Sequence, residues 1–315
     1  MTEPIIEVKD LTKHFVIEHN FWGKPSVVLP AVRKVNFSLQ PGETVGLVGE
    51  SGCGKSTIGR MLVGLYPPTT GKIYYQGQAK KHITKQVQMV FQDPYASLNP
   101  RMTVGAIIEE PMIIHGLQGK LAARQQRVHE LLYMVGLKPE HANRFPHEFS
   151  GGQRQRVGIA RALAAQPQVI VCDEPISALD VSIQAQIVNL LSKLQKELGL
   201  TYLFIAHDLA MIKYISKEVL VMYMGSIVES GPAEQLYQQP LHPYTQALLS
   251  AIPIPAPNQS FVKTRVHLQG EVPNPLALPR GCSFSTRCPL AKTICHEESP
   301  NMITKGNRTV TCHLY

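Results

Sequence analysis

The chain has 315 residues, of which 44% are hydrophobic and 17% charged, and this composition excludes a disulfide-stapled miniprotein and a disordered chain. No run approaches the ~18 consecutive apolar residues that cross a bilayer, and the start MTEPIIEVKD lacks the basic and apolar regions of a signal peptide, so we expect a cytosolic protein unless a partner holds it elsewhere. The net charge of +8 suits a nucleotide, a nucleic acid or an anionic membrane surface as partner, and it equally suits ordinary solvated faces.

The N-terminal part of the chain predicts strands followed by a helix. The runs IIEVKDL, AVRKVNFSL and ETVGLVG, between residues 4 and 49, have the composition of β-strands. A glycine-rich loop follows and leads into KSTIGRMLVGL, whose apolar residues recur with helical spacing. The order strand, loop, helix is typical of a nucleotide-binding α/β core.

The middle of the chain changes from a helical pattern to buried strands. TVGAIIEEPMIIHG and AARQQRVHELLYMVGL predict a helical subdomain, over about 93–160, inserted between core strands. After it, PQVIVCDEP and TYLFIAHD have the character of buried parallel strands, and the helix between them ends at Gly199. We therefore expect an α/β cassette over residues 1–235.

Beyond residue 235 the chain becomes rich in proline, which forbids long helices. We expect residues 236–315 to form a loop-rich extension. Such a segment needs a source of stability other than its own small core.

The strongest motif is GESGCGKST. Its glycines let backbone N–H groups curl around phosphates at a helix N-terminus, and the lysine balances the phosphate charge. Ser56 would place its hydroxyl on Mg²⁺, and Thr57 would reach another phosphate oxygen. An ordinary glycine turn is the alternative. The predicted nucleotide-binding residues here are Gly49, Glu50, Ser51, Gly52, Cys53, Gly54, Lys55, Ser56 and Thr57.

Two adjacent carboxylates end the strand VIVCDEP. Neighbouring side chains of a strand point to opposite sides, so Asp173 and Glu174 are expected to do different work. Asp173 suits the Mg²⁺ hydration shell. Glu174 is then free to polarise a water molecule aimed at the terminal phosphate. Two surface carboxylates without a function are the alternative.

Six motifs in this order and spacing resemble those of the ABC ATP-binding cassettes: GESGCGKST, MVFQDP, FSGGQRQR, VIVCDEP, SALD and IAHD. The resemblance covers residues 5 to about 235. It implies an α/β fold with a P-loop NTPase core, an antiparallel β subdomain and an inserted helical subdomain, and it implies ATP with Mg²⁺. It also implies head-to-tail pairs of cassettes, in which ATP lies between the phosphate loop of one subunit and the signature of the other. The signature residues would be Ser150, Gly151, Gly152 and Gln153, where a serine N-cap and two glycines expose N–H groups that can hold a γ-phosphate.

The same resemblance implies roles for single residues elsewhere. Gln92 would sense Mg²⁺ and the attacking water, and would hold the metal with Ser56 and Asp173. His207 would hydrogen-bond the γ-phosphate and align Glu174. Gln92 and His207 could instead each be structural. The segment Ser177–Asp180 would cross the dimer interface. Phe15 would stack on adenine, at a position where many members have Tyr, or else it belongs to the core.

A narrower resemblance is to the ATPases of dipeptide and oligopeptide permeases, especially the second ATPase subunit, and it rests on QDPYASLNPRMTVG, FPHEFSGGQRQRV, SALDVSIQAQIVNLL and QQPLHPYTQALLSAIP. It implies an ATP-hydrolysing subunit of a peptide importer, peripheral on the cytoplasmic face of the inner (plasma) membrane. The implied partners are a second homologous ATPase subunit in a heterodimer, two transmembrane permease subunits and a periplasmic or lipid-anchored peptide-binding protein, and no nucleic acid.

The segment Asp93–Asn99 would form a groove for short cytoplasmic helices of the permeases, with a simple proline turn as the alternative. Nickel, haem or an antimicrobial peptide stays open as cargo. A soluble ABC protein that acts on nucleic acid also stays open, suggested only by the basic charge.

Four cysteines of the extension lie in the pattern CSFSTRCPLAKTIC followed by a later Cys. Four thiolates at these spacings suit a [4Fe–4S] cluster, and permease ATPases with a similar tail are implied to carry one; zinc and unliganded thiols or disulfides are the alternatives. Arg280, Arg287 and Lys292 would offset the charge of the cluster, and His296 and His313 are possible substitute ligands. The predicted cluster ligands are Cys282, Cys288, Cys295 and Cys312.

Overall fold

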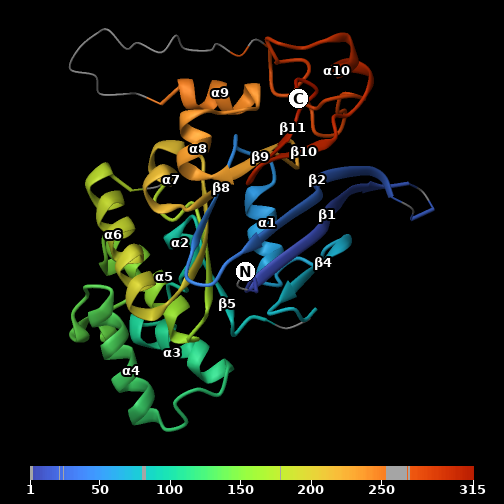
Figure 1. Ribbon diagram of the computed structural model, residues 1–315. Coiled ribbons are helices and arrows are strands. Elements are labelled where there is room, and N and C mark those ends of the chain that lie inside the picture. The colour runs from blue at the N-terminus through green and yellow to red at the C-terminus, as the bar shows by residue number, and fades with distance from the viewer. Residues whose placement is uncertain are drawn as a thin grey trace.

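The structure, a computed structural model, describes residues 3–20, 22–23, 25–79, 83–177, 179–252, 268 and 270–315. A large mixed sheet runs through the middle, a smaller antiparallel sheet lies beside it, and helices cover the remaining faces (Figure 1). The predicted α/β cassette fold is confirmed. Within these ranges no helix combines the length and the hydrophobicity needed to cross a membrane.

The main sheet has the strand order β10-β11-β9-β8-β3-β7-β6-β5 in the described part of the chain. Its parallel strands are β3 (Thr44–Val48), β5 (Val87–Val90), β6 (Val169–Asp173), β7 (Thr201–Ala206) and β8 (Glu218–Tyr223). Its antiparallel strands are β9 (Ser226–Pro232), β10 (Met302–Lys305) and β11 (Arg308–Thr311). The parallel strands β3, β6 and β7 therefore end at one edge, where their loops meet.

The smaller sheet is antiparallel, with the order β2-β1-β4. Its strands are β1 (Ile6–His19), β2 (Pro25–Leu39) and β4 (Thr70–Tyr75). Helix α1 (Lys55–Leu62) contacts β2 on one side and β6 and β7 on the other, so it fills the space between the two sheets.

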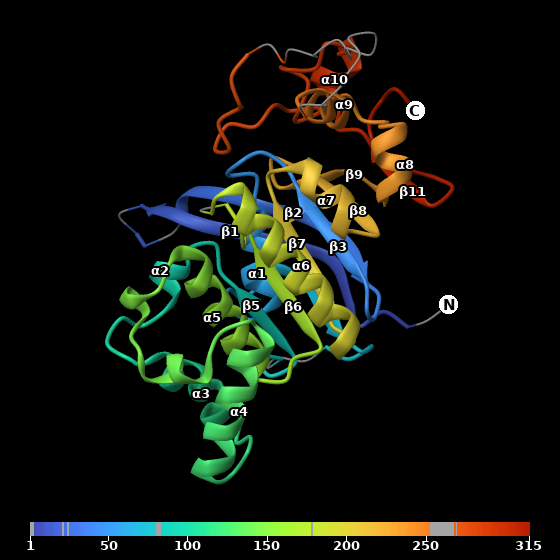
Figure 2. The ribbon, with the colours of Figure 1, turned by 90° about the vertical axis from the view of Figure 1, so that its left-hand side faces the viewer.

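The residues between β5 and β6 form a helical layer, as the sequence pattern indicates. Its helices are α2 (Pro94–Ser97), α3 (Val104–Ile114), α4 (Leu121–Met134), the 3₁₀ turns η1 (Pro139–Asn143) and η2 (Pro146–Glu148), and α5 (Gly151–Ala164). Helix α5 packs on α2, α3 and α4 and also contacts β5, which joins the layer to the main sheet. This layer and the C-terminal extension lie at opposite ends of the molecule in both views (Figure 2).

Two hydrophobic cores lie on the two faces of the main sheet because its side chains alternate. Leu47 and Val171 face the core that contains α1 and the smaller sheet. Val48 and Cys172 face the core that contains the helical layer, α6 (Val181–Leu198), α7 (Leu209–Ile215) and the start of the extension. Successive residues of one strand thus serve different layers.

The extension continues the main sheet. It begins with the short helices α8 (Ala233–Gln238) and α9 (Pro243–Ser250) and carries α10 (Thr293–Glu297) before β10 and β11. Strand β11 pairs with β9 through Thr309 and Val310. The domain boundary that we expect near residue 235 stays a prediction.

Aromatic packing and one buried ion pair fix the extension to the cassette. Phe284, which is 1% exposed, lies 5.2 Å from the Tyr223 ring and 5.4 Å from the Tyr244 ring between centroids. Arg308 donates from its guanidinium to the Glu229 carboxylate of β9 at 2.7 Å, and both side chains are buried. The extension therefore shares a core with the cassette instead of building its own.

Candidate functional site

The phosphate loop joins β3 to α1. Helix α1 begins after Gly54, whose φ of 106° lies in the left-handed region that favours glycine, and a Cβ there would lie 2.2 Å from the Ala31 carbonyl oxygen. The buried Lys55 ammonium donates to the carbonyl oxygens of Gly49 at 2.8 Å and Glu50 at 3.0 Å. The loop backbone, the Lys55 ammonium and the N-terminus of α1 thus lie together, and such an arrangement suits phosphate groups.

The other residues predicted for this loop lie on the same turn. Ser51 and Gly52 are exposed, whereas Cys53 is buried and its burial raises the pKa of the thiol. Cys53 is therefore a packing residue of the loop. Ser56 and Thr57 occupy the first turn of α1 and are half-buried.

Asp173 and Ser56 meet at the start of α1. The Ser56 hydroxyl donates to the Asp173 carboxylate at 2.8 Å. Burial raises the pKa of Asp173, and the hydrogen bond from Ser56 partly opposes that rise. A buried carboxylate beside a hydroxyl is an oxygen pair that Mg²⁺ prefers, so these residues fit the metal.

Glu174 lines an open cleft of about 560 Å³, which Asp173 does not line. Its φ of 43° is rare for a residue other than glycine, and this backbone is held by hydrogen bonds with Ile205 and Ser177. Gln92 donates from its amide nitrogen to the Glu174 carboxylate at 2.8 Å, and His207 Nδ1 lies 3.4 Å from the same carboxylate. The cleft is lined by Ser51, Gln92, Asp93, Glu174, Ser177 and His207.

The signature residues lie outside the lining of that cleft. Ser150 caps α5, because its hydroxyl accepts the Gln153 N–H at 3.4 Å while the Gln153 side chain accepts the Ser150 N–H at 3.0 Å. A Cβ on Gly152 would lie 2.5 Å from Ile183 of α6, so glycine allows these two helix starts to pack closely. The structure thus leaves the predicted signature as a separate, ordered helix N-terminus.

Phe15 lies on β1 against the segment that follows α1. Its ring meets the Tyr66 ring edge to face at 5.4 Å, and the Lys13 ammonium lies 5.1 Å from the Phe15 ring centre. The ring remains half-buried, so part of its surface is open for stacking.

The predicted [4Fe–4S] cluster, with zinc as its alternative, is wrong. In the described ranges no group of three or more His, Cys, Asp or Glu side chains is arranged to hold a metal ion, and all six cysteines are free. Burial raises the pKa of Cys282, Cys288 and Cys312, which favours the thiol over the thiolate that binds metals. Cys295 accepts a hydrogen bond from the Lys292 N–H at the start of α10.

The charge role expected for Arg287 is also corrected. Its guanidinium pairs with the Glu50 carboxylate of the phosphate loop at 2.8 and 3.0 Å. Sequence reasoning missed this contact because the two residues are separated by 237 positions and neither belongs to a motif that names the other.

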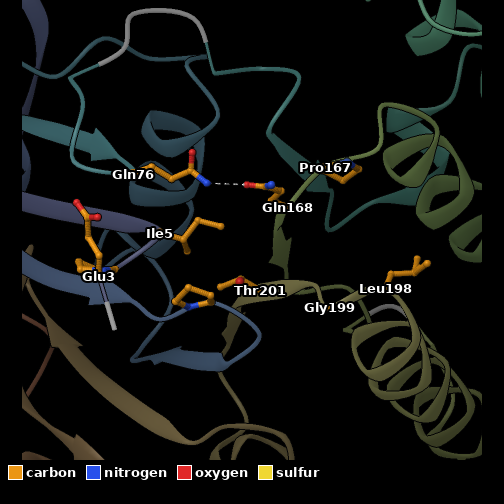
Figure 3. Close-up of a pocket in the computed structure, with 10 residues that line it drawn as sticks. Glu3, Ile5, Gln76, Pro167, Gln168, Leu198, Gly199 and Thr201 are labelled. Carbon is orange, nitrogen blue, oxygen red and sulfur yellow. Dashed lines mark hydrogen bonds between the residues drawn. The ribbon is translucent and has the colours of Figure 1, made fainter. Parts of the chain in front are cut away.

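A second hollow, of about 460 Å³, lies at the opposite edge of the main sheet (Figure 3). Thr201 begins β7 and Gln168 precedes β6, and the Gln76 amide donates to Gln168 at 3.1 Å. None of the predicted nucleotide residues lines it. In open α/β sheets ligands bind at the carboxyl ends of the strands, so the phosphate-loop edge is the candidate site.

Two family models match the chain. The model described as "ABC transporter" matches residues 32–177, and the model described as "Oligopeptide/dipeptide transporter, C-terminal region" matches residues 228–295. The second match spans the boundary between β9 and the extension, so the extension has a family assignment of its own.

Curated relatives are similar along almost their whole length. The chain is 50% identical to the oligopeptide transport ATP-binding protein AppF of Bacillus subtilis, over 99% of this chain and 98% of that protein. It is 49% identical to the oligopeptide transport ATP-binding protein OppF of Escherichia coli, over 98% of this chain and 95% of that protein.

Solved structures share the fold. One is cbiO1 from Clostridium perfringens, part of the ABC transporter complex cbiONQ, with 26% identity, a TM-score of 0.63, and coverage of 76% of this chain and 92% of that chain. Another is the dimeric bacterial ABC transporter cassette MJ0796, with 30% identity, a TM-score of 0.63, and coverage of 72% of this chain and 98% of that chain.

Proposed function

We propose, from the premise that this chain belongs to the family of ABC transporter ATP-binding subunits, that it hydrolyses ATP to drive the import of dipeptides or oligopeptides through partner membrane proteins. The single observation that carries the catalytic part is the cleft in which Gln92 and His207 both approach the Glu174 carboxylate. The transport part rests on the relatives, which are named as oligopeptide transport ATP-binding proteins, and on the C-terminal region match.

Glu174 is the proposed general base. Its carboxylate accepts the proton of a water molecule that attacks the terminal phosphate, and its fixed backbone aims it into the cleft. The Gln92 amide holds one carboxylate oxygen and orients the water. His207, whose side chain is 59% exposed at the cleft, is free to reach a γ-phosphate oxygen.

The phosphate loop holds the rest of the nucleotide. Lys55 and the backbone N–H groups of the loop neutralise the phosphates, and Phe15 stacks on the adenine. Ser56, Asp173 and Gln92 would hold Mg²⁺, which when bound neutralises charge on the phosphate oxygens. The buried Asp173 carboxylate supports this assignment, because a cation would stabilise its charged form.

A second ATPase subunit completes the site in this proposal. Ser150–Gln153 present a capped helix N-terminus outside the chain's own cleft, so the signature would hold the γ-phosphate of ATP bound to a partner subunit. A homologous second subunit would give a heterodimer, in which Ser177, Leu179 and Asp180 would lie at the interface. Ala178, the remaining residue of the predicted segment Ser177–Asp180, lies outside the described residues.

Permease subunits would dock beside Gln92. The segment Asp93–Asn99 contains α2, which Asp93 caps by accepting the Tyr95 N–H, and Tyr95 is 60% exposed. An exposed aromatic side chain next to a residue of the cleft is suited to bind a membrane partner. A movement of that partner would then displace residues of the cleft. The chain would then be peripheral on the cytoplasmic face of the membrane. A separate periplasmic or lipid-anchored peptide-binding protein would select the cargo.

The catalytic assignment is tested with Glu174→Gln. We expect ATP binding to persist and turnover to fall by at least about 100-fold, because the amide keeps the shape but cannot accept a proton. Binding is measured by calorimetry and hydrolysis by phosphate release, with the exposed Glu197→Gln on α6 as a matched control. A Glu174→Gln protein that retains most of its ATPase activity contradicts the role.

The cargo is tested by uptake. A strain that lacks the gene should lose uptake of labelled di- and tripeptides, recover it with the wild-type chain, and fail to recover it with Glu174→Gln. Normal peptide uptake together with lost nickel or haem uptake would replace the cargo but keep the ATPase.

A further inference from the structure

The C-terminal extension touches the phosphate loop through Arg287. Its guanidinium donates two parallel hydrogen bonds to the Glu50 carboxylate, from Nη1 to Oε2 at 2.8 Å and from Nη2 to Oε1 at 3.0 Å. The Arg287 side chain is only 9% exposed and that of Glu50 26% exposed, so water screens this pair less than a surface pair. Two-pronged pairs of this kind fix orientation as well as charge.

A second residue of the extension holds the same loop residue. The Tyr244 hydroxyl of α9 accepts the Glu50 N–H at 2.9 Å. On the other side, the Glu50 carbonyl oxygen accepts from the Lys55 ammonium at 3.0 Å. Glu50 therefore links two residues of the extension to the lysine that faces the phosphates.

The support of Arg287 is itself rigid. Arg287 N–H donates to the Phe284 carbonyl at 3.0 Å, and Phe284 is buried among the rings of Tyr223 and Tyr244. Nearby, the Arg33 guanidinium of β2 donates to the Ser283 hydroxyl at 2.7 Å. A side chain on such a support can define the position of its partner.

Charge gives the pair a second effect. Without a partner, the Glu50 carboxylate would place a negative charge in the loop that receives a polyphosphate, and like charges repel. Arg287 cancels that charge at hydrogen-bond distance. An arginine guanidinium is charged at any pH at which the protein works, and the hydrogen bonds to Glu50 raise the pKa of Arg287 further.

We propose that Arg287 is a positioning residue for ATP. Through Glu50, it holds the phosphate loop in the conformation that binds phosphate, and it neutralises the loop's own carboxylate. The extension would thereby set the affinity of the ATP site. This inference rests on ATP binding at the phosphate loop and is independent of the cargo.

The test is a double-mutant cycle on the purified full-length chain, with the Kd of ATP measured in the presence of Mg²⁺ by calorimetry. Arg287→Ala should raise the Kd about tenfold, because a charge-assisted bond to the loop is lost and the Glu50 charge is exposed. Adding Glu50→Gln to Arg287→Ala should bring the Kd back toward the wild-type value, since it removes the exposed charge. Arg287→Lys keeps the charge but loses the paired geometry. Its Kd should lie between those of the wild type and Arg287→Ala.

The controls separate positioning from unfolding. Arg280→Ala changes an exposed arginine of the same extension and should leave the Kd unchanged. In steady-state assays, Arg287→Ala should raise the KM for ATP while kcat changes by less than about twofold. An unchanged Kd in Arg287→Ala, or a double variant in which the two single effects simply multiply, overturns the inference. Failure of the wild-type chain to bind ATP would instead overturn the proposed function.

Discussion

The nucleotide cleft and the C-terminal extension depend on opposite kinds of contact. The cleft presents polar side chains at strand ends, such as Glu174 and His207, and stays open to solvent. The extension is fixed by a buried aromatic group around Phe284 and by the ion pair between Arg308 and Glu229, which water does not reach. Residues that react are therefore kept accessible, while the element that supports them is anchored out of water.

The largest effect should come from removing one partner of that ion pair. Arg308→Met leaves the Glu229 carboxylate buried and unpaired, so the free energy of unfolding should fall by about 3–5 kcal/mol. Urea unfolding measures the loss, and limited proteolysis should show cleavage in the extension. Adding Glu229→Gln should recover part of the stability, because it removes the unpaired charge and keeps one of the two oxygens that accept the Leu241 and His242 N–H groups.

Acid should weaken the same anchor through His242. This residue caps α9 and is 1% exposed, and burial lowers its pKa from 6.5 to about 4. Between these two values the unfolded chain binds a proton at His242 that the folded chain does not. The contribution of His242 to the free energy of unfolding is therefore fully present above pH 6.5, and up to about 3 kcal/mol is lost as the pH decreases to 4.

His242→Asn is the matched control for this pH dependence. Asparagine replaces the capping Nδ1 of His242 with a capping oxygen and does not titrate, so the variant should lose this part of the pH slope. Equal slopes in the two proteins between pH 6.5 and 4 would exclude His242 as the source.

On the side of the cleft, Lys55→Ala should weaken ATP binding by at least about tenfold, because it removes the charge that faces the phosphates. The exposed Lys196→Ala on α6 serves as the control. Equal ATP affinity of Lys55→Ala and the wild type would contradict the phosphate role. Unfolding of Lys55→Ala should resemble that of the wild type, since the anchor of the extension is untouched.

The smallest effect should come from Tyr244→Phe. It keeps the aromatic packing and removes only the hydroxyl that accepts the Glu50 N–H, a neutral hydrogen bond worth about 1 kcal/mol. We expect the ATP Kd to rise by at most about fivefold, the ratio to which 1 kcal/mol corresponds. A tenfold rise in the Kd would mean that the extension acts on the loop mainly through the hydrogen bond between the Tyr244 hydroxyl and the Glu50 backbone N–H, and less through Arg287.

The sequence predicted the cassette well because the chemistry of the cleft is written in short contiguous motifs. A phosphate loop needs its glycines and lysine within a few residues, and the opposed carboxylates Asp173 and Glu174 follow from strand geometry. The catalytic and binding roles of these residues stay predictions until the variants are measured.

The extension was predicted poorly because its stabilising partners lie elsewhere in the chain. The composition of the extension alone provides only a small core, and this favoured a bound metal as the source of its stability. In the structure Phe284 packs on Tyr223 and Tyr244, and Arg308 pairs with Glu229, a residue of the cassette. Contacts across such separations leave no local pattern in the sequence.

The pairing of β11 with β9 also has a consequence for solubility. Without the extension, β9 would end the main sheet with a row of unpaired backbone groups, which invite pairing with other molecules. The hairpin β10–β11 covers that row and ends the sheet with the four-residue strand β10, which is too short to template a neighbour well. A chain cut before Met302 should therefore self-associate through β9 even where its cassette remains folded.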